Sequence, residues 1–122
     1  MIRWLYVFNY PEGVPVSEGE KWYLGTHTQE AKRMADRGLV GYRTWKALEP
    51  PEAIAGQIRE PAFTRFTELA FEDWDGFRSA VVESDIEYTP PSYGPKGFVY
   101  KTMFIEDQPE YDLLREVPRI EQ

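Results

Sequence analysis

The chain has 122 residues, a formal net charge of −7 and no cysteine, which excludes disulfides, thiolate zinc sites and a Cys nucleophile. Because Asp and Glu outnumber Lys and Arg by 21 to 14, the chain as a whole repels phosphate backbones, and we expect no nucleic-acid partner. The length suits one compact domain. Aromatic residues reach 16%, a high share, and these rings require a core, a ligand pocket or a self-association surface.

The apolar N-terminal stretch MIRWLYVFNY predicts a strand rather than a targeting or membrane segment. It contains Arg3 and meets Pro11 early, so it lacks both a signal-peptide pattern and a membrane span of about 20 apolar residues. We therefore expect a cytoplasmic protein with no membrane partner.

The first half of the chain predicts strand, helix and strand. Residues 2–10 are rich in aromatic and β-branched types. A helix is expected next, where Ser17 and Glu20 match a capping box and Gly38 is a typical stop. Residues 39–48 predict the second strand.

The second half repeats the order after a Pro-rich loop. Residues 49–61 predict that loop, with a helical turn around 53–58, and we expect it to cover a pocket. Residues 63–71 predict the third strand and 72–83 the second helix. The expected inward face of that helix consists of Trp74, Phe77, Val81 and Val82.

A loop with three prolines, residues 85–97, leads into a fourth strand at 98–105. The acidic tail, residues 106–122, is expected to dock on the rest of the chain. Its apolar residues are Tyr111, Leu113, Leu114 and Val117.

The order βαββαβ predicts an α+β fold, a ferredoxin-like sandwich with both helices on one face of a four-stranded antiparallel sheet. We expect a single domain over residues 1–122, with its core in 2–105. The other sheet face then lacks a cover, and a second copy of the chain is the simplest one. The fold thus predicts a homodimer through the sheet face, a dimeric α/β barrel.

His27 is the only histidine, and it falls on the expected inward stripe of the first helix. The stripe consists of Tyr23, His27, Ala31, Met34 and Ala35. A titratable imidazole would therefore face the sheet.

The run WYLGTHTQEAKRMADRGLVGY, residues 22–42, resembles the first helix and second strand of EthD-type proteins, with Tyr23 and His27 in the matching places. The segment FTRFTELAFEDWDGF resembles the third strand and second helix of that family, where Glu68, Phe71 and Asp73 match. This chain departs from the pattern because the proline that commonly follows the histidine is missing. The loop at 85–97 is also long.

The resemblance implies a cavity in each subunit, between helices and sheet, for small hydrophobic or aromatic compounds. EthD-type relatives include cofactor-independent oxygenases, polyketide cyclases, dehydratases and lactone isomerases. A shared fold does not show which of these reactions a protein catalyses.

The proposed chemistry is proton transfer by His27, which in an apolar pocket stays neutral and accepts an acidic proton. The resulting anion needs hydrogen-bond donors, for which Arg65, Tyr6 and Tyr42 are candidates. Strand alternation puts Tyr6 on one sheet face and leaves open which face meets His27.

Further candidates for substrate binding are aromatic, and each has a structural alternative. Trp22, Trp45 and Trp74 either stack on a planar substrate, beside Tyr23 and Tyr42, or belong to the core. Glu68 either orients His27 or forms an ion pair with Arg65 or Lys101, which is the favoured interpretation.

One histidine and scattered carboxylates lack the spacing of a metal site, so we expect neither metal nor cofactor. Two hypotheses remain open. The first is a small enzyme that acts by proton transfer on an aromatic or polyketide-like compound. The second is a noncatalytic protein that binds a hydrophobic ligand or supports a partner enzyme.

Overall fold

The computed structural model describes residues 1–120. The strands are β1 (Ile2–Asn9), β2 (Leu39–Lys46), β3 (Arg65–Phe71) and β4 (Val99–Glu106). The first helical rod consists of α1 (Val16–Trp22), the π-helical turn η1 (Tyr23–His27), α2 (Thr28–Ala31) and the 3₁₀ stretch η2 (Lys32–Arg37). A short α3 (Glu52–Ala55) precedes β3, and the second rod consists of α4 (Trp74–Phe77) and the π-helical η3 (Arg78–Val82).

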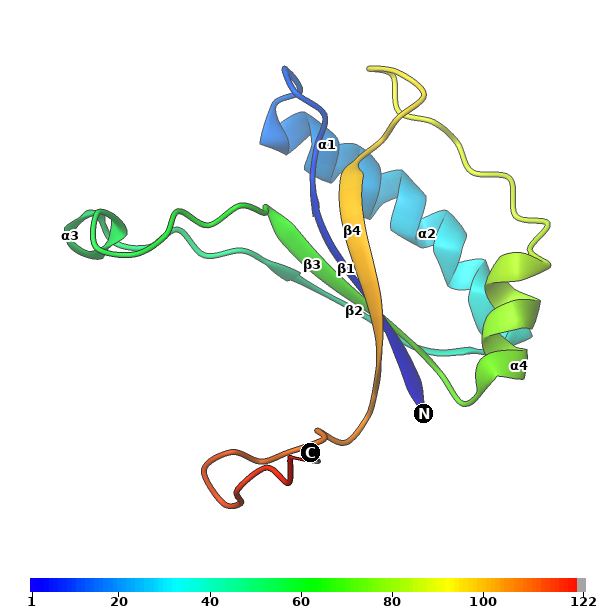
Figure 1. Cartoon of the computed structure of the whole chain (residues 1–122). Coiled ribbons are helices and arrows are strands. Elements are labelled where there is room, and N and C mark those ends of the chain that lie inside the picture. Colours follow the sequence, from blue (N-terminus) through cyan, green and yellow to red (C-terminus); the bar gives the residue numbers. More distant parts are fainter. Residues whose placement is uncertain (121–122) are drawn as a thin grey trace.

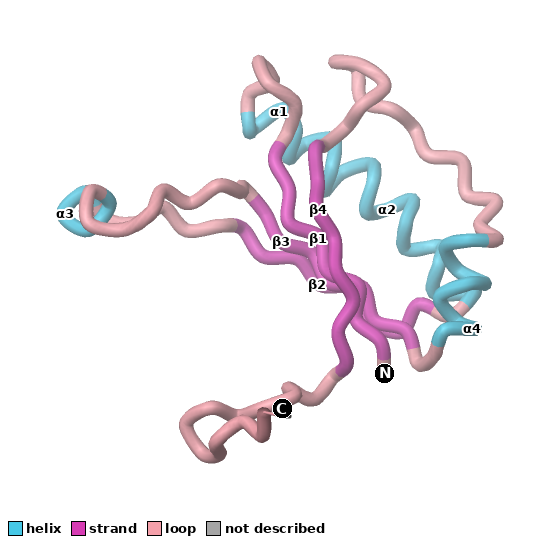
Figure 2. Tube along the Cα trace, viewed as in Figure 1, coloured by secondary structure: helices cyan, strands magenta, loops and turns pink. Residues whose placement is uncertain are grey.

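The four strands form one antiparallel sheet in the order β2-β3-β1-β4. Both helical rods lie on one side of this sheet, as Figure 1 shows and Figure 2 repeats by element type. This is the α+β, ferredoxin-like arrangement that the element order predicts, and the fold class is therefore confirmed.

The register of β1 decides which side chains face the helices. Tyr6 pairs with Thr67 of β3 and with Thr102 of β4, and directly paired residues share a sheet face. Phe8 is on the same face as Tyr6 and is fully buried. The helix-facing set of β1 is thus Ile2, Trp4, Tyr6 and Phe8.

Two buried clusters lie between the helices and the sheet. The larger consists of Ala31, Met34, Leu39, Leu69, Phe71 and Ala80. The smaller consists of Phe8, Tyr10 and Tyr23. The two clusters hold opposite ends of the first helical rod against the sheet.

The first helix begins differently from the capping-box prediction. It starts at Val16 after Pro15, and no side chain caps it, because proline has no side-chain acceptor. The Pro15 carbonyl accepts the first hydrogen bonds of the helix, from the backbone of Glu18 and Gly19. Ser17 therefore lies inside the first turn. The predicted inward stripe is also wrong at its end, because Ala35 is exposed in the 3₁₀ stretch.

The inward face predicted for the second helix is wrong at two positions. Trp74 and Val82 are 57% and 68% exposed, whereas Ala80 is fully buried. The π-helical hydrogen bonds of η3 span five residues, and this wider turn carries Val82 off the face of an ideal α-helix.

Two segments predicted to pack on the domain do not. The loop at 49–61 extends away from the sheet with α3 near its tip (Figure 1), and none of its residues lines the cavity between the helices and the sheet. In the tail, Leu114 and Val117 are 99% and 90% exposed, so their apolar side chains find no surface on the same chain. None of the helices formed by residues 1–120 is long and apolar enough to cross a bilayer.

Gly38 joins the first helical rod to β2 and generates a stability prediction. Its φ is +129°, and an added Cβ would lie 2.6 Å from the Gly76 carbonyl oxygen. Gly38→Ala combines left-handed strain with a backbone clash, and we expect a loss of about 3 kcal/mol in the free energy of unfolding, measured in urea. Gly25→Ala, where an added Cβ meets nothing within 4 Å, is the control and should change stability by less than about 1 kcal/mol. Equal effects of the two substitutions would contradict the prediction.

Candidate functional site

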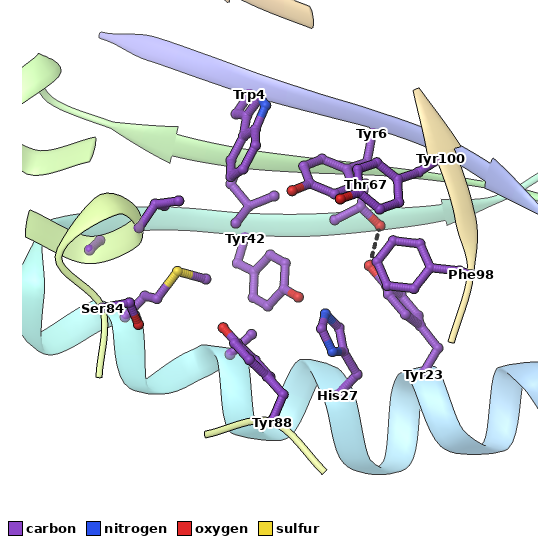
Figure 3. Close-up of a pocket in the computed structure, with 15 residues that line it drawn as sticks. Trp4, Tyr6, Tyr23, His27, Tyr42, Thr67, Ser84, Tyr88, Phe98 and Tyr100 are labelled. Carbon is purple, nitrogen blue, oxygen red and sulfur yellow. Dashed lines mark hydrogen bonds between the residues drawn. The ribbon is translucent and has the colours of Figure 1, made fainter. Parts of the chain in front are cut away.

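A cavity of about 300 Å³ lies between the first helical rod, the helix-facing side of the sheet and the chain that follows η3 (Figure 3). Its walls are mainly aromatic and aliphatic and include Trp4, Tyr6, Tyr23, Tyr42, Tyr88 and Phe98. Among residues 1–120, none of the residues lining it is an Asp, Glu, Lys or Arg. The cavity is therefore an apolar space edged by tyrosine hydroxyls and one imidazole.

The π-helical turn η1 places two of these groups side by side. Tyr23 is its first residue and His27 its last, and the two rings stack with centroids 5.5 Å apart and planes 24° apart. Hydrogen bonds that span five residues bring side chains four positions apart nearly into line along the helix. Both rings consequently reach the cavity from a single turn.

Aromatic rings pack around His27, which remains partly exposed. The Tyr88 ring centroid lies 4.9 Å away and that of Phe98 5.4 Å away. Its Nδ1 is buried without a hydrogen-bond partner in the described part of the chain. Figure 3 shows the imidazole directed toward the Tyr42 hydroxyl.

Burial lowers the pKa of His27 below its ordinary value, and the nearby Glu30 carboxylate only partly opposes this effect. The imidazole is therefore neutral at pH 7. A neutral imidazole at a cavity wall is a hydrogen-ion acceptor.

The tyrosines of the cavity are hydrogen-bond donors. Burial is the main cause that raises the pKa of Tyr6 and that of Tyr42, so both hydroxyls keep their protons near neutral pH. The Tyr23 hydroxyl lies 2.7 Å from Thr67 Oγ1, and burial raises its pKa as well. The site thus offers a proton acceptor among protonated phenols.

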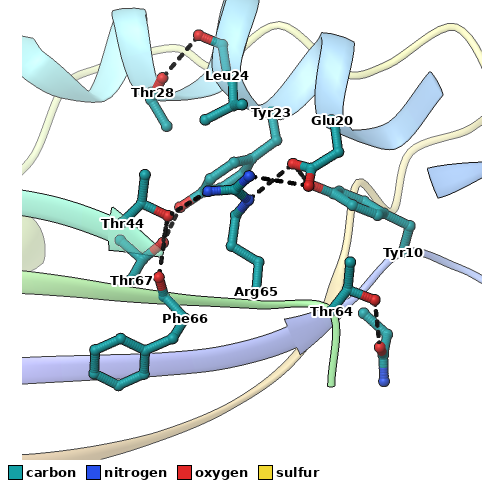
Figure 4. A network of polar contacts seen from close by, with 11 residues as sticks. Tyr10, Glu20, Tyr23, Leu24, Thr28, Thr44, Thr64, Arg65, Phe66 and Thr67 are labelled. Carbon is teal, nitrogen blue, oxygen red and sulfur yellow. Dashed lines mark hydrogen bonds and ion pairs between the residues drawn. The ribbon is translucent and has the colours of Figure 1, made fainter. Parts of the chain in front are cut away.

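Arg65 points to the helix side of the sheet, but it lies beside the cavity rather than in its lining. Its guanidinium donates to both Glu20 carboxylate oxygens, at 2.8 and 3.0 Å (Figure 4). The Tyr10 hydroxyl donates to the same carboxylate at 2.8 Å. Because this buried ion pair neutralises its charge, Arg65 is not a free donor for a molecule in the cavity.

The Arg65 ion pair still contacts the site through hydroxyl groups. Arg65 donates to Thr44 Oγ1 at 3.1 Å, and Thr44 Oγ1 lies 3.0 Å from Thr67 Oγ1. Thr67 in turn binds the Tyr23 hydroxyl. Arg65 therefore holds the Thr44, Thr67 and Tyr23 hydroxyl groups in place without lining the cavity itself.

Glu68 and Trp45 belong to the opposite sheet face. Glu68 forms ion pairs with Arg3 and with Arg43, the latter at 3.2 Å, instead of with Arg65 or Lys101. Trp45 is 45% exposed on the same face. Neither side chain reaches His27.

Trp22 and Trp74 also lie outside the cavity lining. The Trp22 indole lies 5.1 Å from the His27 ring, and its Nε1 donates to the Thr89 carbonyl at 2.9 Å. Trp74 lies at the far end of the sheet, against Phe77 and Phe104. Of the predicted site residues, the structure brings together Tyr6, Tyr23, His27 and Tyr42, and leaves Arg65, Trp22, Trp45, Glu68 and Trp74 outside the cavity.

The sequence analysis did not predict several of the lining residues. Trp4 could have been predicted, because strand alternation places it on the same sheet face as Tyr6. Tyr88 could not have been predicted, because it belongs to a Pro-rich segment without periodicity. Over residues 1–120, the structure gathers no group of three His, Cys, Asp or Glu that would hold a metal ion.

No protein-family model matches the chain, and no curated protein does. Among solved structures, the chain is similar to an EthD family protein from Bacillus halodurans C-125. The TM-score is 0.63 and the identity 16%, over 88% of this chain and 99% of that one. It is also similar to an EthD-like protein from Ralstonia eutropha JMP134, with TM-score 0.56 and 15% identity, over 91% of this chain and 95% of that one. The resemblance to EthD-type proteins is thereby confirmed for the fold: the chain has the α+β fold of that family.

Proposed function

We propose that this EthD-type chain binds a small, flat, largely apolar molecule in the cavity and exchanges a proton with it through His27. The observation that supports this most is a neutral imidazole, with a buried and unpaired nitrogen, at the wall of an aromatic cavity. Perturbed titratable groups in such cavities are the usual starting point for assigning chemistry.

The size and lining of the cavity limit the ligand. At about 300 Å³ it lies at the small end of ligand pockets. Its rings favour a planar aromatic or polyketide-like compound, and the lack of charged groups in its described lining disfavours a strongly charged one.

The proton step needs only groups of this chain. His27 accepts the proton of a phenolic O–H, or of a C–H next to a carbonyl, and the electron pair stays on the ligand as a phenolate or enolate. The hydroxyls of Tyr6 and Tyr42 donate hydrogen bonds to that anion. Cyclisation, dehydration, isomerisation and cofactor-independent oxygenation of such compounds each have a route that starts from an anion of this type.

A noncatalytic ligand-binding role is the second candidate, and one observation favours it. The His27 ring lies between the rings of Tyr23 and Tyr88, and within residues 1–120 no carboxylate accepts a hydrogen bond from its buried Nδ1. An imidazole held this way also serves as an aromatic contact for a bound molecule.

Binding of 4-nitrophenol distinguishes the two candidates, because the phenol and phenolate forms absorb at different wavelengths. We expect the bound probe to be ionised at a pH where the free probe is mostly protonated, because hydrogen bonds from Tyr6 and Tyr42 stabilise the phenolate, and the phenolate charge raises the pKa of His27 in the complex so that His27 takes the proton. In His27→Gln the probe should still bind, but the phenolate absorption of the bound form should be lost.

Tyr111→Phe, a tyrosine of the tail outside the cavity, is the matched control and should behave as wild type. If wild type and His27→Gln bind the probe with the same spectrum, the proton-transfer proposal fails and the binding role remains. If wild type does not bind it, this phenol does not fit the proposed ligand class.

The protonation state of His27 generates a pH prediction. The single-histidine NMR titration should give a pKa below 6.5, the ordinary value. On acidification the unfolded chain binds a proton at its ordinary pKa while folded His27 does not, so stability falls with falling pH. Urea unfolding should show this loss from about pH 6.5 down to the folded pKa in wild type. The loss should be absent in His27→Gln, and parallel curves for the two proteins would contradict the prediction.

We further propose that a second copy of the chain covers the open face of the sheet. That face carries exposed apolar side chains from the edge strands, among them Trp45, Val99, Met103 and Ile105. Its buried acid, Glu68, is paired with Arg3 and Arg43. An apolar, internally neutralised face suits an isologous contact with itself.

Met103→Glu tests this proposal, because Met103 is 58% exposed on the open face. Sedimentation should show a wild-type dimer at micromolar concentration and a Met103→Glu monomer. Val82→Glu places the same charge at an exposed position on the helix side, and this variant should remain dimeric. A wild-type monomer, or a dimeric Met103→Glu, would refute the proposed interface.

A further inference from the structure

The chain between η3 and β4 forms a covering segment, residues 84–98, over the cavity. Figure 1 shows it running alongside the first helical rod on its way to β4. Ser84, Tyr88 and Phe98 of this segment line the cavity. It therefore forms part of the site although it has no regular secondary structure of its own.

Two residues of the covering segment bind polar side chains of the first helical rod. Asp85, near its start, forms an ion pair with Arg37 at 2.6 Å, and Thr89, in its middle, forms three hydrogen bonds. Its backbone N–H donates to Glu30 Oε1 at 2.9 Å, and its hydroxyl donates to Glu30 Oε2 at 2.7 Å. Its carbonyl accepts the hydrogen bond from Trp22 Nε1 at 2.9 Å. All three polar groups of Thr89 are thus bound by side chains of that rod.

The covering segment is stiff on one side of Thr89 and anchored at its end. Pro90 and Pro91 follow Thr89 directly, and proline rings fix the backbone there. Gly97 lies against the Trp22 indole, where an added Cβ would come within 2.1 Å of the ring. The position of Thr89 therefore sets the position of its neighbour, Tyr88.

Tyr88 covers one side of the His27 ring, and His27 itself remains partly exposed. Its ring lies 4.9 Å from the imidazole and is tilted by 30° to it, while the residue remains 40% exposed. In Figure 3 the Tyr88 hydroxyl points into the cavity. The ring has the imidazole on one side and the protein surface on the other.

We infer that Tyr88 is a ligand-contacting residue and that Glu30, acting through Thr89, is a positioning residue that holds Tyr88 over His27. The inference rests on the proposed function, because it assigns a cover to the same cavity. A ligand enters when Thr89 leaves Glu30 and the covering segment lifts. Such local opening is the usual behaviour of segments held by few contacts beside a binding site.

Carbethoxylation of His27 by diethyl pyrocarbonate measures access to the cavity without any ligand. The chain has one histidine, so mass spectrometry of the peptide that contains His27 reports one site. The reaction is run at pH 8, where the imidazole is neutral in every variant, so that changes in the His27 pKa do not alter the rate. The rate then reports how well the covering segment shields the imidazole.

Glu30→Ala removes both acceptors of Thr89 and should raise the His27 modification rate several-fold. Glu30→Gln loses the same charge but keeps an oxygen for the Thr89 N–H and an amide that donates to its hydroxyl, so it should restore a rate near that of wild type. Tyr88→Ala removes the ring without touching Thr89 and should also raise the rate. Glu87→Ala, on the same segment, is the matched control and should have no effect.

Thermal unfolding of each variant identifies any general loss of structure, and Tyr88→Ala keeps the test decisive if Glu30→Ala unfolds. Equal rates in wild type and Tyr88→Ala, or in Glu30→Gln and Glu30→Ala, would overturn the inference. These outcomes are independent of the 4-nitrophenol experiment. The inference about the covering segment can therefore be refuted while the proposed role of His27 is supported, and the reverse is also possible.

Discussion

Side chains alternate strictly between the two sheet faces along β1 and β3, the central strands, and this alternation decides which residues reach the cavity. β1 pairs with both β3 and β4 without a shift in register, so each residue of β1 has a fixed face. Tyr6 and Thr67 therefore meet the helices, whereas Glu68 meets the open face. A slip of one residue would carry the charged side chains into the cavity and the rings out of it.

Alternation and ion pairing together keep charge out of the apolar cavity. Glu68 is neutralised on the open face by Arg3 and Arg43, and Arg65 is neutralised by Glu20 beside the smaller buried cluster. Breaking a buried pair of this kind costs about 3–5 kcal/mol, which explains why Arg65 stays with Glu20. With its charges held elsewhere, the cavity retains a low polarity that keeps His27 neutral.

The fold could be predicted from the sequence because it follows from the helix and strand periodicity of apolar residues. Of the site, only the residues that lie on such periodic segments could be predicted. The helical spacing of Tyr23 and His27 and the strand position of Tyr6 led to the cavity. The face of β1 that meets the helices was undetermined until its pairing was known, since both faces carry apolar residues. Trp45 and Trp74 were predicted as site residues from their aromatic character alone, and both are exposed outside the cavity, because aromatic character by itself does not indicate burial.

Tyr88 and the exposed tail show where local sequence carries no such information. Tyr88 is placed by a side chain 58 residues away in the sequence, Glu30, through the backbone of Thr89. The rod that presents His27 to the cavity also provides Glu30 and Trp22, which fasten the cover. Any shift of this rod along the sheet would therefore move the imidazole and its cover together. The geometry between His27 and Tyr88 is consequently set mainly by the contacts between the covering segment and this rod.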